Sequence, residues 1–511
     1  MKFNILNITC VSVTVELDND KIYQVDKEYD VYLNEEKVKT LKENVFTIFD
    51  LKPNYEYSIR IDDDVKNFKT LNVDYILHTS NFIKGDSQKD DTLRLQAAIN
   101  MTPSSSLLVF DEKEYHISSL FLKSDITIYL KKDVKIFAST DIDDYSMAIG
   151  EIKANNDLKK PLELLSWEGN PLLGKTSIIC GYNVKNVNLI GEGIIDGQAD
   201  KSTFWHDVKN LKWGRPRLLF LNNCDNIKVI GLTFKNTPCW TIHPFFSSNL
   251  EFYNLFISNP KDSPNTDGMD PESCENLKII GVKFSVGDDC IALKSGKKYI
   301  GSLFKKPTEH VLIRNCFMNE GHGAIVLGSE VGAGLKDLLI ERCYFKHTDR
   351  GLRIKSRRGR GKDSVIDDVT FSNIIMDNVL TPLTINMFYF CDPDGKSDYV
   401  QNRNPRDVDD DTPYLGKFTF KNIKATDCEV ALGYFLGLPE QKIGEIEIID
   451  STFTMKENSP LSSPIMACNV DKLHNSGFHI TNVKKVKFHN VKTSGYTDKE
   501  LILDNVDEVI R

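Results

Sequence analysis

A single pattern of apolar and polar positions returns along most of the chain. It begins with a polar residue and carries apolar residues at its second, fourth, seventh and ninth positions, around a corner that is often Asn or Gly. The clearest copies span residues 226–234, 249–257, 276–284, 310–318, 337–345 and 368–376, and weaker ones begin near residues 186, 417, 445 and 485. Alternation on both sides of the corner predicts two short β-strands in each copy.

The spacing of these copies favours a parallel β-helix. Neighbouring clear copies begin 23 to 34 residues apart, and a β-rich repeat of this length is typical of a solenoid whose coils stack on one another. A β-propeller is the alternative, but its blades need four strands in about 40 regular residues. These copies are too short and too uneven for blades. We therefore predict an all-β protein in which residues 79–511 form a parallel β-helix.

The pattern of residues 1–78 predicts a separate, smaller β-module. Val11, Val13, Val15 and Leu17 alternate with polar residues, as in a half-buried strand. The stretch 51–61 places a tyrosine shortly before an alternating strand, which is the sequence context of a tyrosine corner in β-sandwiches. The module resembles fibronectin type III modules, and we expect an accessory or spacer role for it. After it, Asp91 is placed to start a short amphipathic helix that covers the open end of the coils.

Composition and charge restrict the classes of function. The 511 residues are too many for one ordinary core, and no apolar run approaches the 18 residues of a membrane span. A net charge of −9 argues against nucleic-acid binding. The eleven cysteines are odd in number and never spaced as CxxC, so we expect buried free thiols. Because the N-terminus also has no continuous apolar leader, we expect a cytoplasmic location, with a secreted or periplasmic one as the alternative if a leader has been removed.

The strand that follows each corner can be aligned between coils through a shared serine, at positions 273, 295, 329 and 356. Two apolar columns then face inward, because side chains alternate along a strand. They consist of Met269, Ile291, Ile325 and Leu352, and of Pro271, Leu293, Leu327 and Ile354.

The residues between these columns face outward and gather charge on one side of the coils. Asp267 stacks over Asp289, and Asp288 stacks over His322. An aspartate beside glycine is often only a turn residue, but three stacked carboxylates about 5 Å apart raise one another's pKa and indicate a function. Glycosidic hydrolysis is such a function, since it needs one protonated carboxyl and one ionised carboxylate.

Cations accompany the carboxylates in the same alignment. Lys294, Arg353 and Lys355 face outward, and His322 lies beside Asp288, which it could tune or orient. The basic run 353–362 would usually be a solvated loop. Next to carboxylates, it is better explained as a site for an anionic substrate, whose carboxylate Arg353 could bind through two hydrogen bonds.

Four motifs in this order resemble the signature segments of the polygalacturonases, glycoside hydrolase family 28. They are Asn265-Thr-Asp267, Gly287-Asp288-Asp289, Gly321-His322-Gly323 and Arg353-Ile354-Lys355. The resemblance covers roughly residues 80 to 500. It implies a right-handed parallel β-helix, an inverting mechanism and neither a metal nor another cofactor.

The resemblance also implies roles for single residues. By motif, Asp288 corresponds to the general acid, and Asp267 and Asp289 to the pair that activates water. His322 would assist the acid, while Arg353 and Lys355 would hold a galacturonate carboxylate. Tyr389 is similar to a family tyrosine one coil further on, although Met387 stands where many members have Gln. We also expect Asn265 and Lys294 to contact substrate. Further candidate contacts are Arg215, Arg217, Trp240 and His243.

We therefore predict hydrolysis of polygalacturonate or oligogalacturonides. An inverting mechanism leads us to expect carboxyl groups about 6.5–9.5 Å apart. The segments 141–180 and 196–216, together with the N-terminal module, favour an exo-acting enzyme because they can close one end of the groove. The alternatives are an endo-polygalacturonase and a hydrolase of rhamnogalacturonan or xylogalacturonan. A calcium-dependent pectate lyase and a non-catalytic carbohydrate-binding solenoid are two further alternatives.

Overall fold

The computed structural model describes residues 1–85, 90–148, 165–171, 173–208 and 214–511. The first part of the chain forms two antiparallel sheets, of three strands in the order β1-β2-β5 and of four in the order β4-β3-β6-β7. The bounds of these strands are β1 Phe3–Ile8, β2 Val13–Leu17, β3 Gln24–Leu33, β4 Glu36–Glu43, β5 Val45–Ile48, β6 Glu56–Ile61 and β7 Asp64–Lys69. The alternating residues Val13, Val15 and Leu17 pack between the sheets with Val31 and Ile59. A small β-sandwich is the result.

Two details of this module bear on the sequence analysis. The Tyr57 hydroxyl accepts a hydrogen bond from the backbone N–H of Lys52 at 2.8 Å, as expected for a tyrosine corner. The strand β8 (Ile76–His78), which the repeat pattern had left in the module, pairs in parallel with β9 (Ser106–Phe110). The sheet of the β-helix therefore begins with β8.

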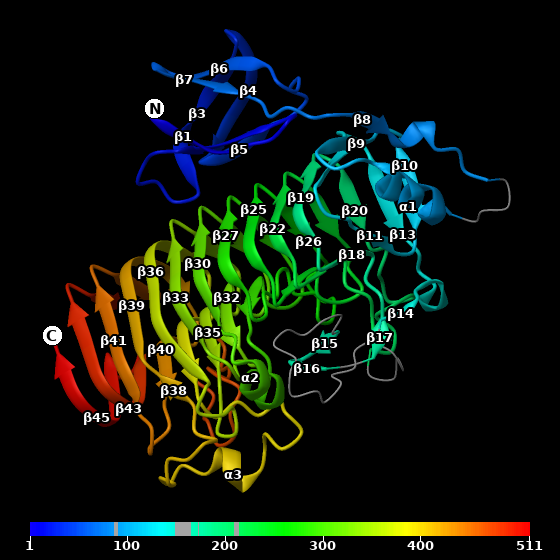
Figure 1. The fold of residues 1–511 in the computed structure, drawn as a ribbon. Coiled ribbons are helices and arrows are strands. Elements are labelled where there is room, and N and C mark those ends of the chain that lie inside the picture. Colours follow the sequence, from blue (N-terminus) through cyan, green and yellow to red (C-terminus); the bar gives the residue numbers. More distant parts are fainter. Residues whose placement is uncertain (86–89, 149–164, 172, 209–213) are drawn as a thin grey trace.

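The module lies alongside the coils rather than at their end (Figure 1). Val11, Val45 and Phe49 of the module share an apolar cluster with Ile230 and Ile280 of the β-helix. Hydrogen bonds and ion pairs surround this cluster. In particular, Glu16 is buried against Arg314 and Arg342 of two neighbouring coils. The module is thus packed against the wall of the β-helix through a continuous interface.

From β8 to the C-terminus the strands form coils that stack in parallel (Figure 1). One column contains the first strand of each repeat: β22 Asp225–Ile230, β25 Ser248–Tyr253, β27 Glu275–Ile280, β30 Thr308–Arg314, β33 Leu335–Glu341 and β36 Val365–Asp377. A second contains the strand after the corner: β23 Thr233–Lys235, β26 Phe256–Ser258, β28 Lys283–Ser285, β31 Phe317–Asn319 and β34 Tyr344–Lys346. Each repeat therefore supplies two strands of its coil, as predicted.

The backbone conformation explains why each repeat starts with a polar residue. Asn226, Asn249 and Asn276 all have φ between 53° and 57°, in the left-handed region that asparagine tolerates better than most residues. Their side-chain amides also bond between coils, as from Asn276 Nδ2 to Asn249 Oδ1 at 3.2 Å. Asparagine at this place thus turns the chain and links neighbouring coils.

A third column carries the serine-anchored segments. It contains β24 (Ile242–Phe245), the stretch 267–273, β29 (Ile291–Leu293), β32 (Ile325–Gly328), β35 (Arg350–Lys355) and β37 (Thr381–Asn386). Met269 pairs with Ile291, Ile291 with Ile325, and Ile325 with Leu352. This is the register that the serine alignment predicted. The apolar column is buried, so the residues between it point outward.

Helices are few. The helix α1 (Thr92–Met101) contacts β11 (Leu120–Phe121) and lies at the N-terminal end of the coils (Figure 1). The helices α2 (Lys298–Phe304) and α3 (Asp398–Gln401) belong to loops. Within the described ranges, no helix has the length and apolar character needed to cross a membrane. All eleven cysteines are free thiols and nine are buried, as expected.

Candidate active site

The outward face of the third column forms a cleft of about 480 Å³, which lies in the size range of ligand sites. Its lining contains the catalytic and main substrate-binding residues predicted from the sequence: Asn265, Asp267, Asp288, Asp289, Lys294, His322, Arg353, Lys355 and Tyr389. Of the further candidate contacts, Trp240 lines the cleft, whereas Arg215, Arg217 and His243 are buried outside its lining. Residues more than 120 positions apart in the chain therefore meet in one cleft, because the coils stack in register.

Asp289 is paired with two cations of the cleft. Its Oδ1 accepts from Arg353 Nη1 at 3.1 Å and its Oδ2 from Lys355 Nζ at 2.8 Å. Burial by itself would raise the pKa of Asp289, but Lys355 and Arg353 bring that pKa below its usual range. Asp289 is therefore ionised.

In contrast to Asp289, Asp267 and Asp288 have raised pKa values. Burial, and then the charge of Asp288, raises the pKa of Asp267 well above its ordinary value, and Asp267 Oδ1 has no hydrogen-bond partner. Burial and the neighbouring Asp289 likewise raise the pKa of Asp288. The cluster thus holds its negative charge on Asp289 and favours protons on the other two carboxyls, which is the mixed state that acid/base hydrolysis requires.

The three carboxyl groups approach one another closely, since one oxygen from each lies within 4.8 Å of the others. The coil spacing of about 4.8 Å explains this approach, because Asp267 and Asp289 occupy equivalent places on adjacent coils. The expected separation of about 6.5–9.5 Å between whole carboxyl groups stays a prediction. A divalent cation would also fit between such oxygens, but Arg353 and Lys355 already donate to both oxygens of Asp289.

His322 is fixed by a residue that the sequence analysis did not consider. Its Nδ1 lies 3.0 Å from Asp349 Oδ2, and this hydrogen bond, followed by the charge of Asp288, raises the pKa of His322. Asp288, His322 and Asp349 occupy the same position on three successive coils. Extending that column by one coil would have found it.

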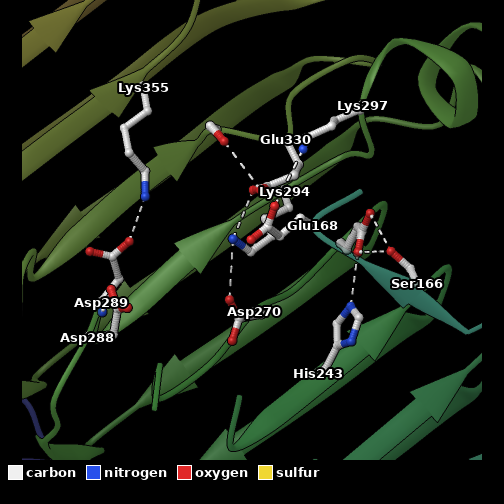
Figure 2. A network of polar contacts seen from close by, with 12 residues as sticks. Ser166, Glu168, His243, Asp270, Asp288, Asp289, Lys294, Lys297, Glu330 and Lys355 are labelled. Atoms are coloured by element: carbon white, nitrogen blue, oxygen red, sulfur yellow. Dashed lines mark hydrogen bonds and ion pairs between the residues drawn. The ribbon is translucent and has the colours of Figure 1, made fainter. Parts of the chain in front are cut away.

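Lys294 lines the cleft, but its ammonium group is already paired. Its Nζ lies 3.0 Å from Glu330 Oε2 and 3.5 Å from Asp270 Oδ1 (Figure 2). Burial would raise the pKa of Glu330, but Lys294 and Lys355 lower it to about 2. Asp270 differs, since burial raises its pKa to about 8. Lys294 is therefore the counterion of Glu330 in this state, and its predicted contact with substrate stays a prediction.

Asn265 and Tyr389 complete the predicted set. Asn265 Oδ1 accepts from Arg215 Nη2 at 2.6 Å, so Arg215 holds a side chain of the cleft from behind. Tyr389 is mostly buried, and its ring centroid lies 5.8 Å from Lys355 Nζ. Burial raises the pKa of Tyr389, so its hydroxyl is a hydrogen-bond donor at ordinary pH.

The basic run 353–362 divides into two functions, which corrects the prediction that the whole run serves an anionic ligand. Arg353 and Lys355 face the cleft, as expected. Arg357 pairs with Asp392 and Asp394, and Arg358 is buried against Glu440. These arginines hold the loop 390–412 against the coils. The alternation of β35 sends the first two cations outward, whereas the later ones lie beyond its end.

A short hairpin stands over the cleft on the side of the earlier coils. It consists of β15 (Ser166–Trp167) and β16 (Asn170–Pro171), and the Trp167 ring stacks on Trp240 with centroids 5.1 Å apart. The carbonyl of Gly169 accepts from the backbone N–H of Lys297 at 3.0 Å. A Cβ at Gly169 would lie 2.5 Å from that nitrogen, so the approach needs glycine. Much of the predicted closing segments, residues 149–164, 172 and 209–213, lies outside the described residues.

His243, which Figure 2 labels, forms a buried pair with Glu272, and their Nε2 and Oε2 atoms are 3.0 Å apart. The His243 ring also contacts the Trp240 ring, with centroids 5.0 Å apart. Burial, followed by the charge of Glu330, raises the pKa of Glu272 to about 7. Burial also lowers the pKa of His243 well below its usual value. Both groups are thus neutral under mildly acidic conditions, and they share a hydrogen bond rather than an ion pair. His243, a candidate substrate contact from the sequence, is fully buried in this pair.

Several residues of the cleft carried no signal in the sequence. Trp167, Glu330, Cys391 and Met466 line it. Trp167 lies in the short hairpin and the other three lie in loops between the strands of the coils, and these segments follow no period that could place them.

A family model agrees with this site. The description "Glycosyl hydrolases family 28" matches residues 134–409, which is more than half of the chain. The chain belongs to this family. The matched region contains the four motifs and all the residues that line the cleft except Met466.

Curated relatives support the assignment to family 28, and a solved structure supports the fold. A probable polygalacturonase from Vitis vinifera is 32% identical over 57% of this chain and 59% of its own length. An exo-poly-alpha-D-galacturonosidase from Dickeya chrysanthemi is 26% identical over 67% of this chain and 61% of its own. The family 28 exopolygalacturonase of Yersinia enterocolitica has a TM-score of 0.72 at 17% identity, and the match covers 100% of this chain and 98% of that one. The right-handed parallel β-helix is thereby confirmed. The chain spans between half and three fifths of the first curated relatives that it matches.

Proposed function

We propose that the protein hydrolyses α-1,4-galacturonosidic bonds in polygalacturonate or oligogalacturonides. One observation carries this proposal: two neighbouring carboxyl groups of the cleft differ in their affinity for a proton. Asp288 favours its protonated form, whereas Asp289 is ionised between Arg353 and Lys355. Membership of family 28 and curated relatives named as polygalacturonases support the choice of substrate.

In the proposed reaction, Asp288 gives its proton to the glycosidic oxygen as the bond from that oxygen to C1 breaks. A water molecule attacks C1 from the opposite face and loses a proton to a carboxylate of the pair Asp267 and Asp289. Two hydrogen bonds of about 2.8 Å at a tetrahedral angle span about 4.5 Å. Carboxylate oxygens within 4.8 Å of each other suit this arrangement. We propose inversion at C1, as the family resemblance implies.

We further propose that the enzyme acts from a chain end. The hairpin 166–171 supports this, because Trp167 and Glu168 line the cleft and stand in the path of a long polymer on the side of the earlier coils. Both endo-acting and exo-acting enzymes occur among the curated relatives, so their names do not decide the mode of action.

Product chromatography on polygalacturonate and on defined oligomers tests the proposal. Release of small products of one size from the start of the reaction is expected for exo action, whereas a ladder of oligomers would indicate an endo-polygalacturonase. Proton NMR of the first product should show the β-anomer. Absence of hydrolysis would leave the carbohydrate-binding solenoid as the better explanation.

The remaining alternative functions can be distinguished by further assays on the same samples. A pectate lyase would need calcium and would form an unsaturated product that absorbs ultraviolet light, so chelator would stop it. We expect activity in chelator and no such absorbance. Faster release from rhamnogalacturonan or xylogalacturonan than from polygalacturonate would assign the protein to those hydrolases.

A further inference from the structure

The cations of the cleft already have partners. Lys294 is paired with Glu330, His322 with Asp349, and Arg350 donates to the carbonyl oxygens of Ser463 and Pro464. Arg353 and Lys355 differ from these, because their partner is Asp289, a carboxylate that the proposed reaction uses.

Both oxygens of Asp289 are engaged, one by each cation, at 3.1 Å and 2.8 Å. A carboxylate held in this way is a weak base, since the two cations stabilise its ionised form. The second nitrogen of the Arg353 guanidinium contacts the Met466 sulfur at 2.7 Å, and a thioether is a weak acceptor. A carboxylate that enters the cleft could therefore replace both the thioether and Asp289 as the partner of Arg353.

We infer that the carboxylate of the bound galacturonate takes Arg353 and Lys355 away from Asp289, and that this exchange makes Asp289 a competent base. The inference rests on the proposed function and adds a role for the substrate's own charge. Once its cations have turned to the substrate, Asp289 is left in a buried site that faces Asp267, Asp288, His322 and Tyr389. Burial and the nearby carboxyls then increase its affinity for a proton.

The exchange makes a free carboxylate on the sugar a condition for turnover as well as for binding. A methyl ester at that position cannot displace Asp289, because it carries no charge. We therefore expect esterification there to reduce kcat as well as to raise KM.

Calorimetric titration of the whole protein with digalacturonate tests the exchange. Every protein titrated carries Asp288→Asn, so that the ligand is not cleaved, and is otherwise wild type or the variant named. Measurements in two buffers of different ionisation enthalpy give the number of protons bound with the ligand. Wild type should take up a fraction of a proton that grows as the pH falls from 6 to 4, because Asp289 gains proton affinity in the complex. Asp289→Asn should lose this uptake. It should also bind digalacturonate about ten- to hundredfold more tightly, since one competing charged hydrogen-bond acceptor is gone.

Asp349→Asn is the matched control, because it removes another cleft carboxylate without freeing Arg353 or Lys355. It should gain no more than about threefold in affinity. The exchange would be overturned, and the proposed function left intact, if wild type and Asp289→Asn took up the same number of protons and bound digalacturonate equally tightly. A wild-type protein that does not bind digalacturonate would overturn the proposed function itself.

A second measurement needs no variant. In wild type, the acidic limb of kcat should lie at higher pH than the acidic limb of kcat/KM, because kcat reports Asp289 in the complex, without its cations. Coincident limbs would contradict the exchange.

Discussion

At the scale of single residues, Asp288 and Asp289 are chain neighbours with opposite proton affinities. The backbone N–H of Asp289 donates to Asp288 Oδ1 at 2.9 Å, while the Asp289 side chain turns to Arg353 and Lys355. Both residues lie in the bend before β29 (Ile291–Leu293), where their side chains take different partners. Two adjacent aspartates can therefore serve as acid and base.

Asp288→Asn should reduce kcat by at least about a hundredfold, because the amide cannot protonate the leaving oxygen. Binding of digalacturonate, measured by calorimetry, should remain within a few-fold of wild type. The matched variant is Glu272→Gln, which changes a buried carboxyl to an amide below the cleft and should keep most of the activity. Ordinary turnover by Asp288→Asn would contradict the assignment of the acid.

Glu272 also has a pH-dependent effect on stability. Its pKa is raised from 4.5 to about 7 in the folded protein, so the unfolded chain loses this proton at lower pH than the folded chain does. The contribution of Glu272 to the free energy of unfolding should therefore fall between pH 4.5 and 7, by up to about 3 kcal/mol. Urea unfolding should show that Glu272→Gln loses less stability than wild type over this range. Parallel curves would mean that Glu272 is ionised in the fold.

At the scale of elements, the hairpin β15–β16 is the part of the structure on which the proposed exo action depends, because Trp167 and Glu168 line the cleft. Its place depends on a few contacts, which are the stacking of Trp167 on Trp240, the hydrogen bond from Ser166 to Glu272 and the approach of Gly169 to Lys297. Other family members could change these without altering the coils.

Trp167→Ala should open this end of the cleft. We expect a wider range of products from polygalacturonate and a lower ratio of activity on short oligomers to activity on the polymer, both measured by chromatography. Tyr299→Ala on α2 is the control, because Tyr299 is exposed and does not line the cleft. Unchanged products from Trp167→Ala would show that the hairpin does not limit the substrate.

At the scale of the whole molecule, the N-terminal module is integrated with the β-helix. Glu16 accepts from Arg314 Nε at 2.8 Å and from Nη2 at 2.7 Å, and its Oε1 also accepts from Asn315 at 2.7 Å. Tyr23 stacks on Phe317 with centroids 5.3 Å apart. The accessory module that we expected from the sequence is therefore attached through buried polar and aromatic contacts, and we predict that it stabilises the coils.

Glu16→Gln should lower the free energy of unfolding by about 2–4 kcal/mol, because it removes the buried carboxylate shared by Arg314 and Arg342 and leaves Arg314 with Glu341 as its remaining ionic partner. Glu35→Gln is the control, since the pair of Glu35 with Arg60 is exposed and should contribute less than about 1 kcal/mol. Denaturant unfolding of both variants makes the comparison. Equal losses would show that the interface does not stabilise the protein.

The sequence by itself determined the coils, their register and the identity of the central residues. It could do so because a strand has a period of two and each coil repeats the last, so that Asp267, Asp289, Arg353 and Lys355 fall on one face wherever the serines align. The same alignment, extended by one coil, would also have predicted Asp349. The four ordered motifs added the family.

Only the tertiary structure decided which groups pair within the cleft. Arg353 and Lys355 bind Asp289, Lys294 binds Glu330, and the arginines beyond Lys355 fasten a loop. It also placed Trp167 over the cleft and the module against the wall of the coils. These contacts join loops and coils far apart in the chain, and their side chains follow no local period. Their partners depend on distance and burial, which a pattern of residues does not contain.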